Sequence, residues 1–201
     1  MRRWSLILAV FTLWCLCTPL YGGVVLFETF NEMTGDYEGA TLVDAFYTIN
    51  NTNVDIVANG GIFGNLCQAP ESYTCVDMDG GRGSGNPQGQ LQSSMLFPAG
   101  NYLLSFDLIG SQRGTTAATT VMFGNYNQTF TLLSNDDSSG IVVHQPVTLD
   151  SPGYLYFLSD TPGAIGNLLD NVVVETATPE PSTLILMGSG LLLAGIRFRR
   201  R

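Results

Sequence analysis

Residues 91–109, LQSSMLFPAGNYLLSFDLI, decide the fold class of this chain. Aromatic and aliphatic runs stand on both sides of Pro98-Ala99-Gly100-Asn101, and these four residues tolerate positive φ or are pre-set for a turn. Runs of this length and composition are typical of β-strands. The stretch therefore predicts two strands, 90–97 and 102–109, that reverse direction at the turn and pair as a β-hairpin.

The same pattern continues over residues 23–177. Short β-branched and aromatic runs are separated by clusters of Gly, Asn, Asp and Pro, without sustained helical periodicity. The other predicted strands are 24–30, 42–49, 54–57, 73–78, 119–123, 128–133, 141–149, 153–158 and 168–175. Because this length suits one domain, the sequence predicts a single all-β domain, a β-sandwich, over residues 23–177.

A segment of different character, residues 178–201, follows this domain. It contains Pro179, Glu180 and Pro181, then an apolar run over 183–196, then the terminal arginines Arg197, Arg199, Arg200 and Arg201. As a helix, the run would span about 21 Å, less than the ~30 Å hydrocarbon core of a bilayer. The segment thus predicts a hydrophobic helix held transiently in the inner membrane, with the arginines as a stop on the cytoplasmic side.

Pro-Glu-Pro-Ser-Thr at 179–183, the Leu- and Gly-rich run and the basic end resemble the PEP-CTERM sorting signal of Gram-negative, exopolysaccharide-producing bacteria. The resemblance implies that Pro179, Glu180 and Pro181 form the sorting motif. It also implies that exosortase, a membrane transpeptidase-like enzyme, cuts nearby and delivers the protein to the cell surface or extracellular matrix. An ordinary tail anchor is the alternative interpretation.

The N-terminal residues 1–22 indicate export. Arg2 and Arg3 precede an apolar stretch from Trp4 to Leu16, and small residues follow at positions 22 and 23. This is the order of the charged, hydrophobic and cleavage regions of a signal peptide. We expect a signal helix that engages the secretion translocon and is removed by signal peptidase near residue 22 or 23.

Without its two ends, the chain is strongly acidic. It has no lysine, and of its eight arginines only Arg82 and Arg113 lie within residues 23–177, together with every acidic residue except Glu180. Two cations against sixteen acids give this part a formal charge of about −14. Such a surface repels nucleic acid and anionic lipid, so no nucleic-acid partner is expected.

Cys67 and Cys75 are the only cysteines beyond the signal segment. We predict that they form a disulfide, because an exported protein meets an oxidising environment. The alternative is half of a metal site, for which His144 is the only further soft ligand.

A second resemblance covers nearly the whole domain. Phe27-Glu28, VDIV at 54–57, VDMDG at 76–80, FPAGNYLLSFDL at 97–108 and LDNV at 169–172 resemble, in this order, the landmarks of galactose-binding-like jelly rolls. In that fold a structural calcium commonly joins the first strand to the last, and the matching positions are Glu28 and Asp170. Carboxylate oxygens suit Ca²⁺, although both acids could equally serve a strand end and a turn. No other cofactor is expected.

Sugar-binding members of that fold often carry Trp on the binding face, but Trp4 and Trp14 both lie in the signal segment. The tyrosines that could stack on sugar rings are Tyr37, Tyr47, Tyr73, Tyr126, Tyr154 and Tyr156. Tyr37 and Tyr126 are the preferred ligand-binding candidates because they lie in predicted loops. Tyr154 and Tyr156, in a predicted strand, are more typical of core or cross-strand pairs.

No Gly-x-Ser-x-Gly, His-Glu-x-x-His or Walker motif occurs in the sequence, so we predict that the protein is not an enzyme. The sequence predicts an exported, exosortase-sorted surface or matrix protein with a non-catalytic binding or structural β-sandwich. One alternative is a carbohydrate-binding module that recognises exopolysaccharide. Less favoured are an ice-binding protein, suggested by threonines at 115, 116, 119 and 120, and a glycoside hydrolase, which needs two convergent carboxylates.

Overall fold

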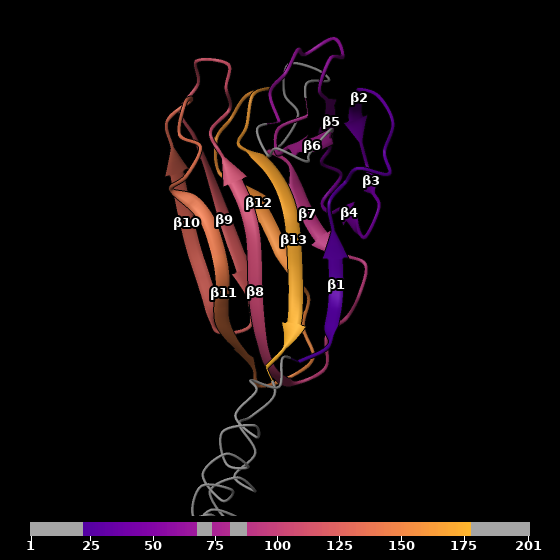
Figure 1. The fold of residues 1–201 in the computed structure, drawn as a ribbon, viewed down its shortest axis with the longest axis vertical. Coiled ribbons are helices and arrows are strands. Elements are labelled where there is room, and N and C mark those ends of the chain that lie inside the picture. The colour runs from indigo at the N-terminus through magenta and orange to yellow at the C-terminus, as the bar shows by residue number, and fades with distance from the viewer. Residues whose placement is uncertain (1–21, 68–73, 81–87, 178–201) are drawn as a thin grey trace, which may run out of the picture. The chain divides into compact units, whose positions relative to one another are not determined.

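The computed structural model describes residues 22–67, 74–80 and 88–177, and residues 23–176 form one compact unit (Figure 1). The strands are β1 Val24–Glu28, β2 Tyr37–Ala40, β3 Leu42–Val43, β4 Phe46–Thr48, β5 Val54–Ala58, β6 Thr74–Asp77, β7 Gln90–Ser93, β8 Gly100–Ile109, β9 Ala117–Phe123, β10 Tyr126–Leu132, β11 Gly140–Leu149, β12 Tyr156–Ser159 and β13 Leu168–Thr176. None of the described residues belongs to a helix long and apolar enough to cross a membrane. The predicted signal helix, up to residue 21, and the predicted hydrophobic helix lie outside the described residues.

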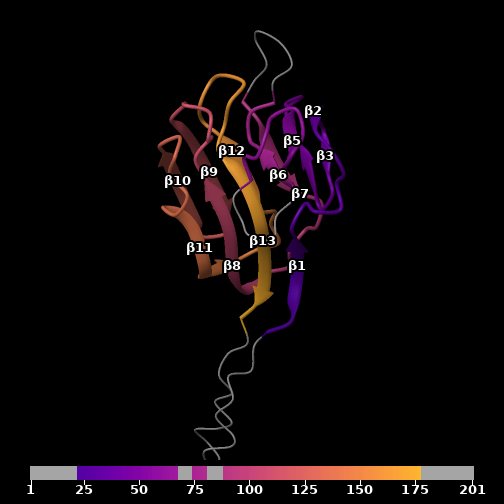
Figure 2. The same ribbon diagram turned by 45° about the horizontal axis from the view of Figure 1, so that its top comes forward.

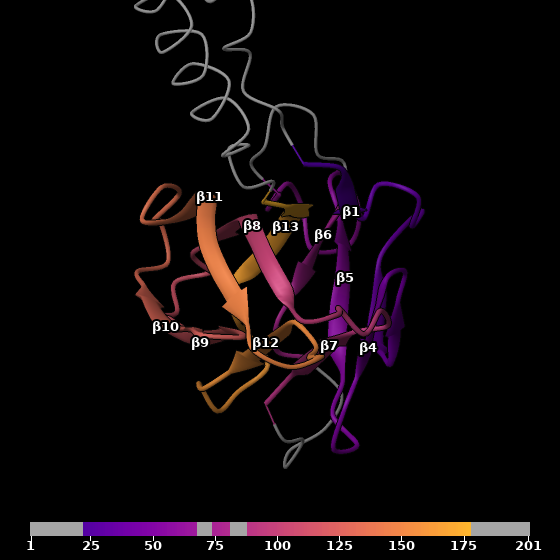
Figure 3. The same ribbon diagram turned by 90° about the horizontal axis from the view of Figure 1, so that it is seen from below.

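Within the described residues the strands form two sheets, which Figure 3 shows as separate layers. The seven-stranded sheet has the order β11-β8-β13-β6-β5-β2, and β1 also pairs with β13. The six-stranded sheet has the order β10-β9-β12-β7-β4-β3. Figure 2 shows β2 and β3 at one side of the sandwich and β10 and β11 at the other. The predicted all-β sandwich is confirmed.

The predicted hairpin over residues 90–109 is wrong, because β7 and β8 lie in different sheets. β7 pairs with β4 and β12, whereas β8 pairs with β11 and β13. Between them, Phe97 is buried in the core, and its backbone exchanges hydrogen bonds of 2.9 and 3.0 Å with Gly153. These bonds hold Phe97 beside the segment before β12, which belongs to the same sheet as β7, and the turn after Phe97 then starts β8 in the opposite sheet.

The core lies between the sheets and is rich in aromatic rings. The inward side chains of β8 are Tyr102, Leu104, Phe106 and Leu108, each at most 5% exposed. Across the layers, the Phe106 ring contacts Phe157 at a centroid distance of 5.4 Å, and within the six-stranded sheet Phe157 contacts Phe46 at 5.9 Å. Residues on either side of these positions along a strand consequently point outward.

Most other predicted strands are confirmed within three residues at each end. The predicted strand 42–49 is instead two strands, β3 and β4, because the chain turns at Asp44 with a φ of 47°. β2 was not predicted from the sequence. It is short, contains Gly39 at a φ of 73° and pairs with β5 through a bulge.

β1 and β13 bring the two ends of the compact unit side by side. Val24 lies opposite Glu175, and the backbone N–H of Thr176 donates to the Gly23 carbonyl at 3.0 Å. The first and last residues of the unit therefore lie at the same end of the sandwich (Figure 1).

Candidate functional site

A row of side chains crosses the outward face of the six-stranded sheet. In the antiparallel registers, Tyr47 of β4 lies opposite Gln92 of β7, Gln92 opposite Tyr156 of β12, and Tyr156 opposite Met122 of β9. Residues that lie opposite each other on paired strands point to the same side of a sheet. The adjacent residues along the same strands are buried in the core: Phe46, Leu91, Phe157 and Val121. The row therefore faces away from the core.

This row extends to both edges of the sheet. Leu42 of β3 lies opposite Tyr47, and Asn127 of β10 lies opposite Met122. We call the complete set the outer row: Leu42, Tyr47, Gln92, Tyr156, Met122 and Asn127. Both edge residues are exposed.

The centre of the outer row is a packed cluster of tyrosines around one amide. Gln92 points outward but is only 8% exposed, and its Nε2 donates to the Tyr47 hydroxyl. The ring of Tyr154 packs edge-on against that of Tyr156, with the centroids 6.3 Å apart. Partial burial, with Tyr47 and Tyr154 close by, raises the pKa of Tyr156. The phenols and the amide thus hold one another in place before any ligand arrives.

A second row of outward side chains runs beside the first. Its members, which lie opposite one another in the registers, are Gln90, Leu158, Thr120 and Thr129. The Thr120 and Thr129 hydroxyls are 2.7 Å apart, and Thr120 also donates to Asp160, which directly follows β12. Amide and hydroxyl groups therefore adjoin the tyrosines on this face.

The two outer faces of the sandwich differ in charge. Among the described residues of the two rows and their neighbours Tyr154 and Asp160, only Asp160 carries a charge. On the outward face of the seven-stranded sheet, by contrast, the His144 Nε2 lies 3.3 Å from a Glu175 carboxylate oxygen, and Asp107 accepts a hydrogen bond of 2.7 Å from Asn171. The outer row is thus a nearly uncharged surface on a strongly acidic domain.

Tyrosine rings and side-chain amides are among the groups with which proteins bind carbohydrate. A tyrosine combines an apolar ring face with a polar hydroxyl, so it can stack on the C–H face of a sugar and bind a hydroxyl group. An amide donates and accepts at once, as hydroxyl ligands require. The outer row supplies both kinds of group on one open surface.

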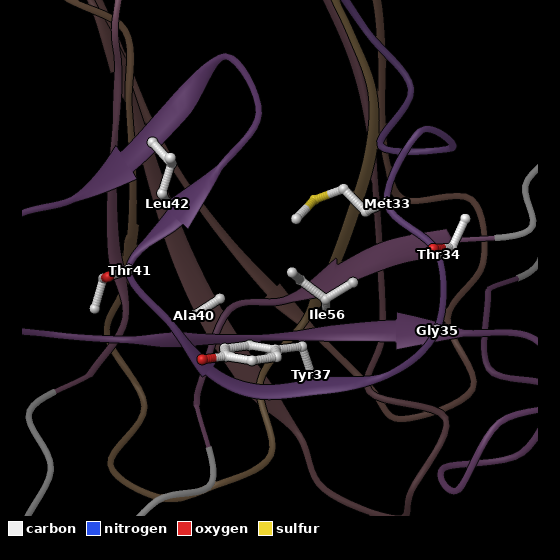
Figure 4. A pocket seen from close by; sticks show the side chains of 8 residues that line it. All are labelled: Met33, Thr34, Gly35, Tyr37, Ala40, Thr41, Leu42 and Ile56. Atoms are coloured by element: carbon white, nitrogen blue, oxygen red, sulfur yellow. The ribbon is translucent and has the colours of Figure 1, made fainter.

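Of the two tyrosines favoured from the sequence, Tyr37 lines an open pocket of about 360 Å³ at the β2–β3 edge (Figure 4). Its other lining residues are Met33, Thr34, Gly35, Ala40, Thr41, Leu42 and Ile56. Tyr37 lies in β2 rather than in the predicted loop, and its side chain is exposed. Because Leu42 lines the pocket and ends the outer row, the two features adjoin.

Tyr126 and Tyr37 belong to different sheets. Tyr126 belongs to β10, at the edge of the six-stranded sheet opposite β3, and not to a loop. It packs partly buried against the core, and this burial raises its pKa. The structure thus does not bring the two favoured tyrosines together, and Tyr73 lies outside the described residues.

The tyrosines that do meet are Tyr47, Tyr154 and Tyr156, which the sequence favoured less than Tyr37 and Tyr126. The strand pattern favoured core or cross-strand positions for Tyr154 and Tyr156. Tyr156 does lie across from Gln92, but the rings of Tyr154 and Tyr156 also pack against each other and point outward, and Tyr47 joins them from β4. The sequence signal for this face was the alternation of Tyr154 and Tyr156 with the apolar residues Leu155 and Phe157, which are both buried in the structure.

The predicted calcium ligands Glu28 and Asp170 are both buried. The two Glu28 carboxylate oxygens accept backbone N–H groups, from Phe30 at 2.6 Å and from Ala45 at 3.2 Å, and burial raises the pKa of Glu28. Asp170 accepts the N–H of Asn171 at 2.7 Å. In the part of the chain that the structure describes, no group of three or more His, Cys, Asp or Glu side chains is arranged to hold a metal ion. Calcium at Glu28 and Asp170 stays a prediction.

The predicted disulfide is confirmed: Cys67 and Cys75 are bonded, with their Cα atoms 5.7 Å apart. Asn59 also holds this segment, because its side chain donates to the Cys67 carbonyl at 2.7 Å and accepts the Cys67 N–H at 3.1 Å. The bond fastens the residues after β5 to the start of β6.

Several carboxylates meet in the interior rather than in a cleft. Asp55 and Asp77 lie opposite each other on β5 and β6, Asp79 follows β6, and each is at most 2% exposed. Arg113 forms an ion pair with Asp77. Burial raises the pKa of Asp79 and lowers that of Arg113. These acids therefore form a buried cluster with Arg113.

Residues 177–201 match the PEP-CTERM protein-sorting motif. The predicted sorting signal is thereby confirmed, and the chain carries a signal that marks substrates of exosortase and implies export and sorting to the surface. Pro179, Glu180, Pro181 and the terminal arginines themselves lie outside the described residues. A comparison with curated protein sequences found no match.

Three solved β-sandwiches are similar to this chain. The tandem CBM22-1–CBM22-2 domain of Paenibacillus barcinonensis Xyn10C is 16% identical, with a TM-score of 0.46, over 80% of this chain and 48% of its own. The CBM22-1 xylan-binding domain of the same protein is 15% identical, also with a TM-score of 0.46, and the match covers 79% of this chain and 97% of that domain. The K3 cleaved adhesin domain of Lys-gingipain from Porphyromonas gingivalis has the same identity and TM-score, and the match covers 76% of this chain and 98% of that domain. This chain therefore spans about half the length of the tandem domain.

Proposed function

We propose that this protein is an exported, exosortase-sorted surface or matrix protein whose β-sandwich is a non-catalytic glycan-binding module. The outer row carries the proposal. Tyr47 and Tyr156 flank the amide of Gln92 on an open, nearly uncharged sheet face, and the contacts among them fix the side chains before binding. A preorganised surface loses less side-chain entropy on binding than a flexible one.

A non-catalytic role agrees with the placement of the acids. Glycoside hydrolysis needs two carboxyl groups that reach the glycosidic bond, and Asp55, Asp77 and Asp79 are buried away from solvent. On the glycan-binding face itself, Asp160 stands without a second acid among the residues of the two rows. The chemistry available there is stacking and hydrogen bonding.

The binding half of the proposal can be tested by retardation in native gels that contain polysaccharide. The full chain is purified in a polyoxyethylene detergent, which carries no sugar headgroup. We expect Tyr156→Ala to weaken retention by about tenfold or more, the loss typical of a central aromatic anchor, and Tyr156→Phe to keep most of it because the ring remains. Phe27→Ala is the matched control, because Phe27 is a 67% exposed aromatic residue on the other sheet. Equal retention of Tyr156→Ala and the wild type, with both folded, would defeat this role of the face.

The sorting half is tested by the intact mass of the protein recovered from the surface of an exosortase-containing host. Removal of residues 1–22 or 1–23 by signal peptidase and of everything beyond the Pro179–Pro181 region is expected. A surface-exposed form that still ends at Arg201 is the outcome that contradicts exosortase processing. The mass also reports any attached glycan.

A further inference from the structure

We infer that the ligand of the outer row is an uncharged, extended polysaccharide, bound by an internal segment that lies across the strands of the six-stranded sheet. This inference rests on the proposed glycan-binding function and names the class of glycan. Three observations carry it: the length of the row, its two open ends and its lack of charge.

The length of the outer row suits several sugar units rather than one. The row crosses from β3 to β10 through neighbouring strands, and strands lie about 4.8 Å apart, so it is roughly 24 Å long. Tyr47 and Tyr156 are two strands apart, which is about 10 Å and close to the length of a disaccharide in an extended chain. The two rings can therefore stack on alternate sugars while Gln92, between them, reaches the intervening one.

The ends of the outer row are open. Leu42 is 66% exposed and Asn127 is exposed, and each stands on an edge strand of its sheet. A site that recognised the end of a glycan would need a wall to stop the chain, and neither edge residue supplies one. A polysaccharide can continue past both edges, so internal segments fit.

Charge excludes the other large class of polysaccharides. Uronate-containing chains carry a negative charge on many sugars, and the domain that they would approach has a formal charge of about −14. None of the residues in the two rows is cationic, and Arg113 is engaged by Asp77 in the interior. A neutral chain is not repelled, and it loses no ionic hydration on meeting tyrosine and amide groups.

The test compares neutral and anionic polysaccharides with the full chain in polyoxyethylene detergent. The neutral probes are hydroxyethyl cellulose, a linear β-1,3-glucan and galactomannan, and the anionic probes are alginate and polygalacturonate. We expect retention by at least one neutral probe to be about tenfold stronger than by either anionic probe. Because no ion pair is formed, that retention should change little between low and high salt. Tyr156→Ala should weaken it by about tenfold or more, and Phe27→Ala should leave it unchanged.

Two outcomes overturn the inference, and they can be told apart. Retention by alginate or polygalacturonate alone, lost in Tyr156→Ala, would overturn the ligand class but leave glycan binding at this face standing. No retention by any of the five probes would overturn the proposed binding function and this inference together. Competition tests the length: a hexasaccharide of the bound polymer should displace the protein, and equal displacement by its monosaccharide would contradict a row-long site.

Discussion

Replacing Arg113 by methionine is expected to destabilise the domain strongly, because it removes the counter-ion of a buried carboxylate. Asp77 has no exposed surface, and one of its oxygens accepts the N–H groups of Asp79 and Gly166 at 3.0 and 2.8 Å. The other oxygen faces Arg113. Breaking a buried ion pair on one side typically costs about 3–5 kcal/mol. The Arg113 side chain is 20% exposed, and partial access of water places the loss near the lower value.

A loss of about 3 kcal/mol lowers the melting temperature of a domain of this size by roughly 6–12 °C. Circular dichroism of the full chain in detergent measures it. The double variant Arg113→Met with Asp77→Asn should recover about half of the loss or more, because asparagine keeps the oxygen that accepts the two N–H groups and removes the charge. A free energy of unfolding of Arg113→Met within about 1 kcal/mol of the wild type would refute a buried ion pair of this strength, as would a double variant less stable than Arg113→Met alone.

Two further predictions concern stability. Burial raises the pKa of Asp79 above its ordinary value of 3.8, so ionisation of Asp79 opposes folding. Thermal melts of Asp79→Asn and the wild type should therefore coincide below that pH and separate in favour of the variant as the pH rises, whereas a gap that does not change with pH would contradict a titration effect. Loss of the Cys67–Cys75 bond, which closes a loop with a sequence separation of 8, should cost about 2.5 kcal/mol. Denaturant melts of Cys67→Ser/Cys75→Ser measure this cost, and an unchanged midpoint would show that the loop is already restricted in the unfolded chain.

Local composition predicted the strands of this domain but not their partners. The turn residues after Phe97 are equally compatible with a hairpin and with a crossing between sheets. The choice depends on the burial of Phe97 and on its backbone pairing with Gly153, which is distant in the sequence. The PEP-CTERM motif, in contrast, is contiguous and could be read directly. β2 escaped prediction because a bulge and a glycine at positive φ leave only a short, irregular run.

The candidate site could not be predicted from the sequence for the same reason that the strand partners could not. A strand pattern predicts that Tyr154 and Tyr156 share a face, but not which face is buried or which strands lie beside it. The preference for Tyr37 and Tyr126 assumed that binding residues lie on loops, yet both lie on strands at opposite edges. The outer row is created by the registers of β4, β7, β12 and β9, which bring residues from four separate runs into one line.

A substitution of Gln92 can distinguish a binding role of the outer row from a purely structural one. Cross-strand pairs contribute about 0.2–1 kcal/mol each to a sheet, so tyrosines on an outward face could serve stability alone. Methionine at position 92 would fill a similar volume between Tyr47 and Tyr156 and lose only the amide. Tyr47 is partly exposed, so its hydroxyl can bind water instead. We therefore expect the free energy of unfolding of Gln92→Met to lie within about 1 kcal/mol of the wild-type value. The variant should nevertheless bind a neutral polysaccharide about three- to tenfold more weakly, which corresponds to the loss of one hydrogen bond. A stable variant with unchanged retention would show that the amide packs the tyrosines and makes no contact with the glycan.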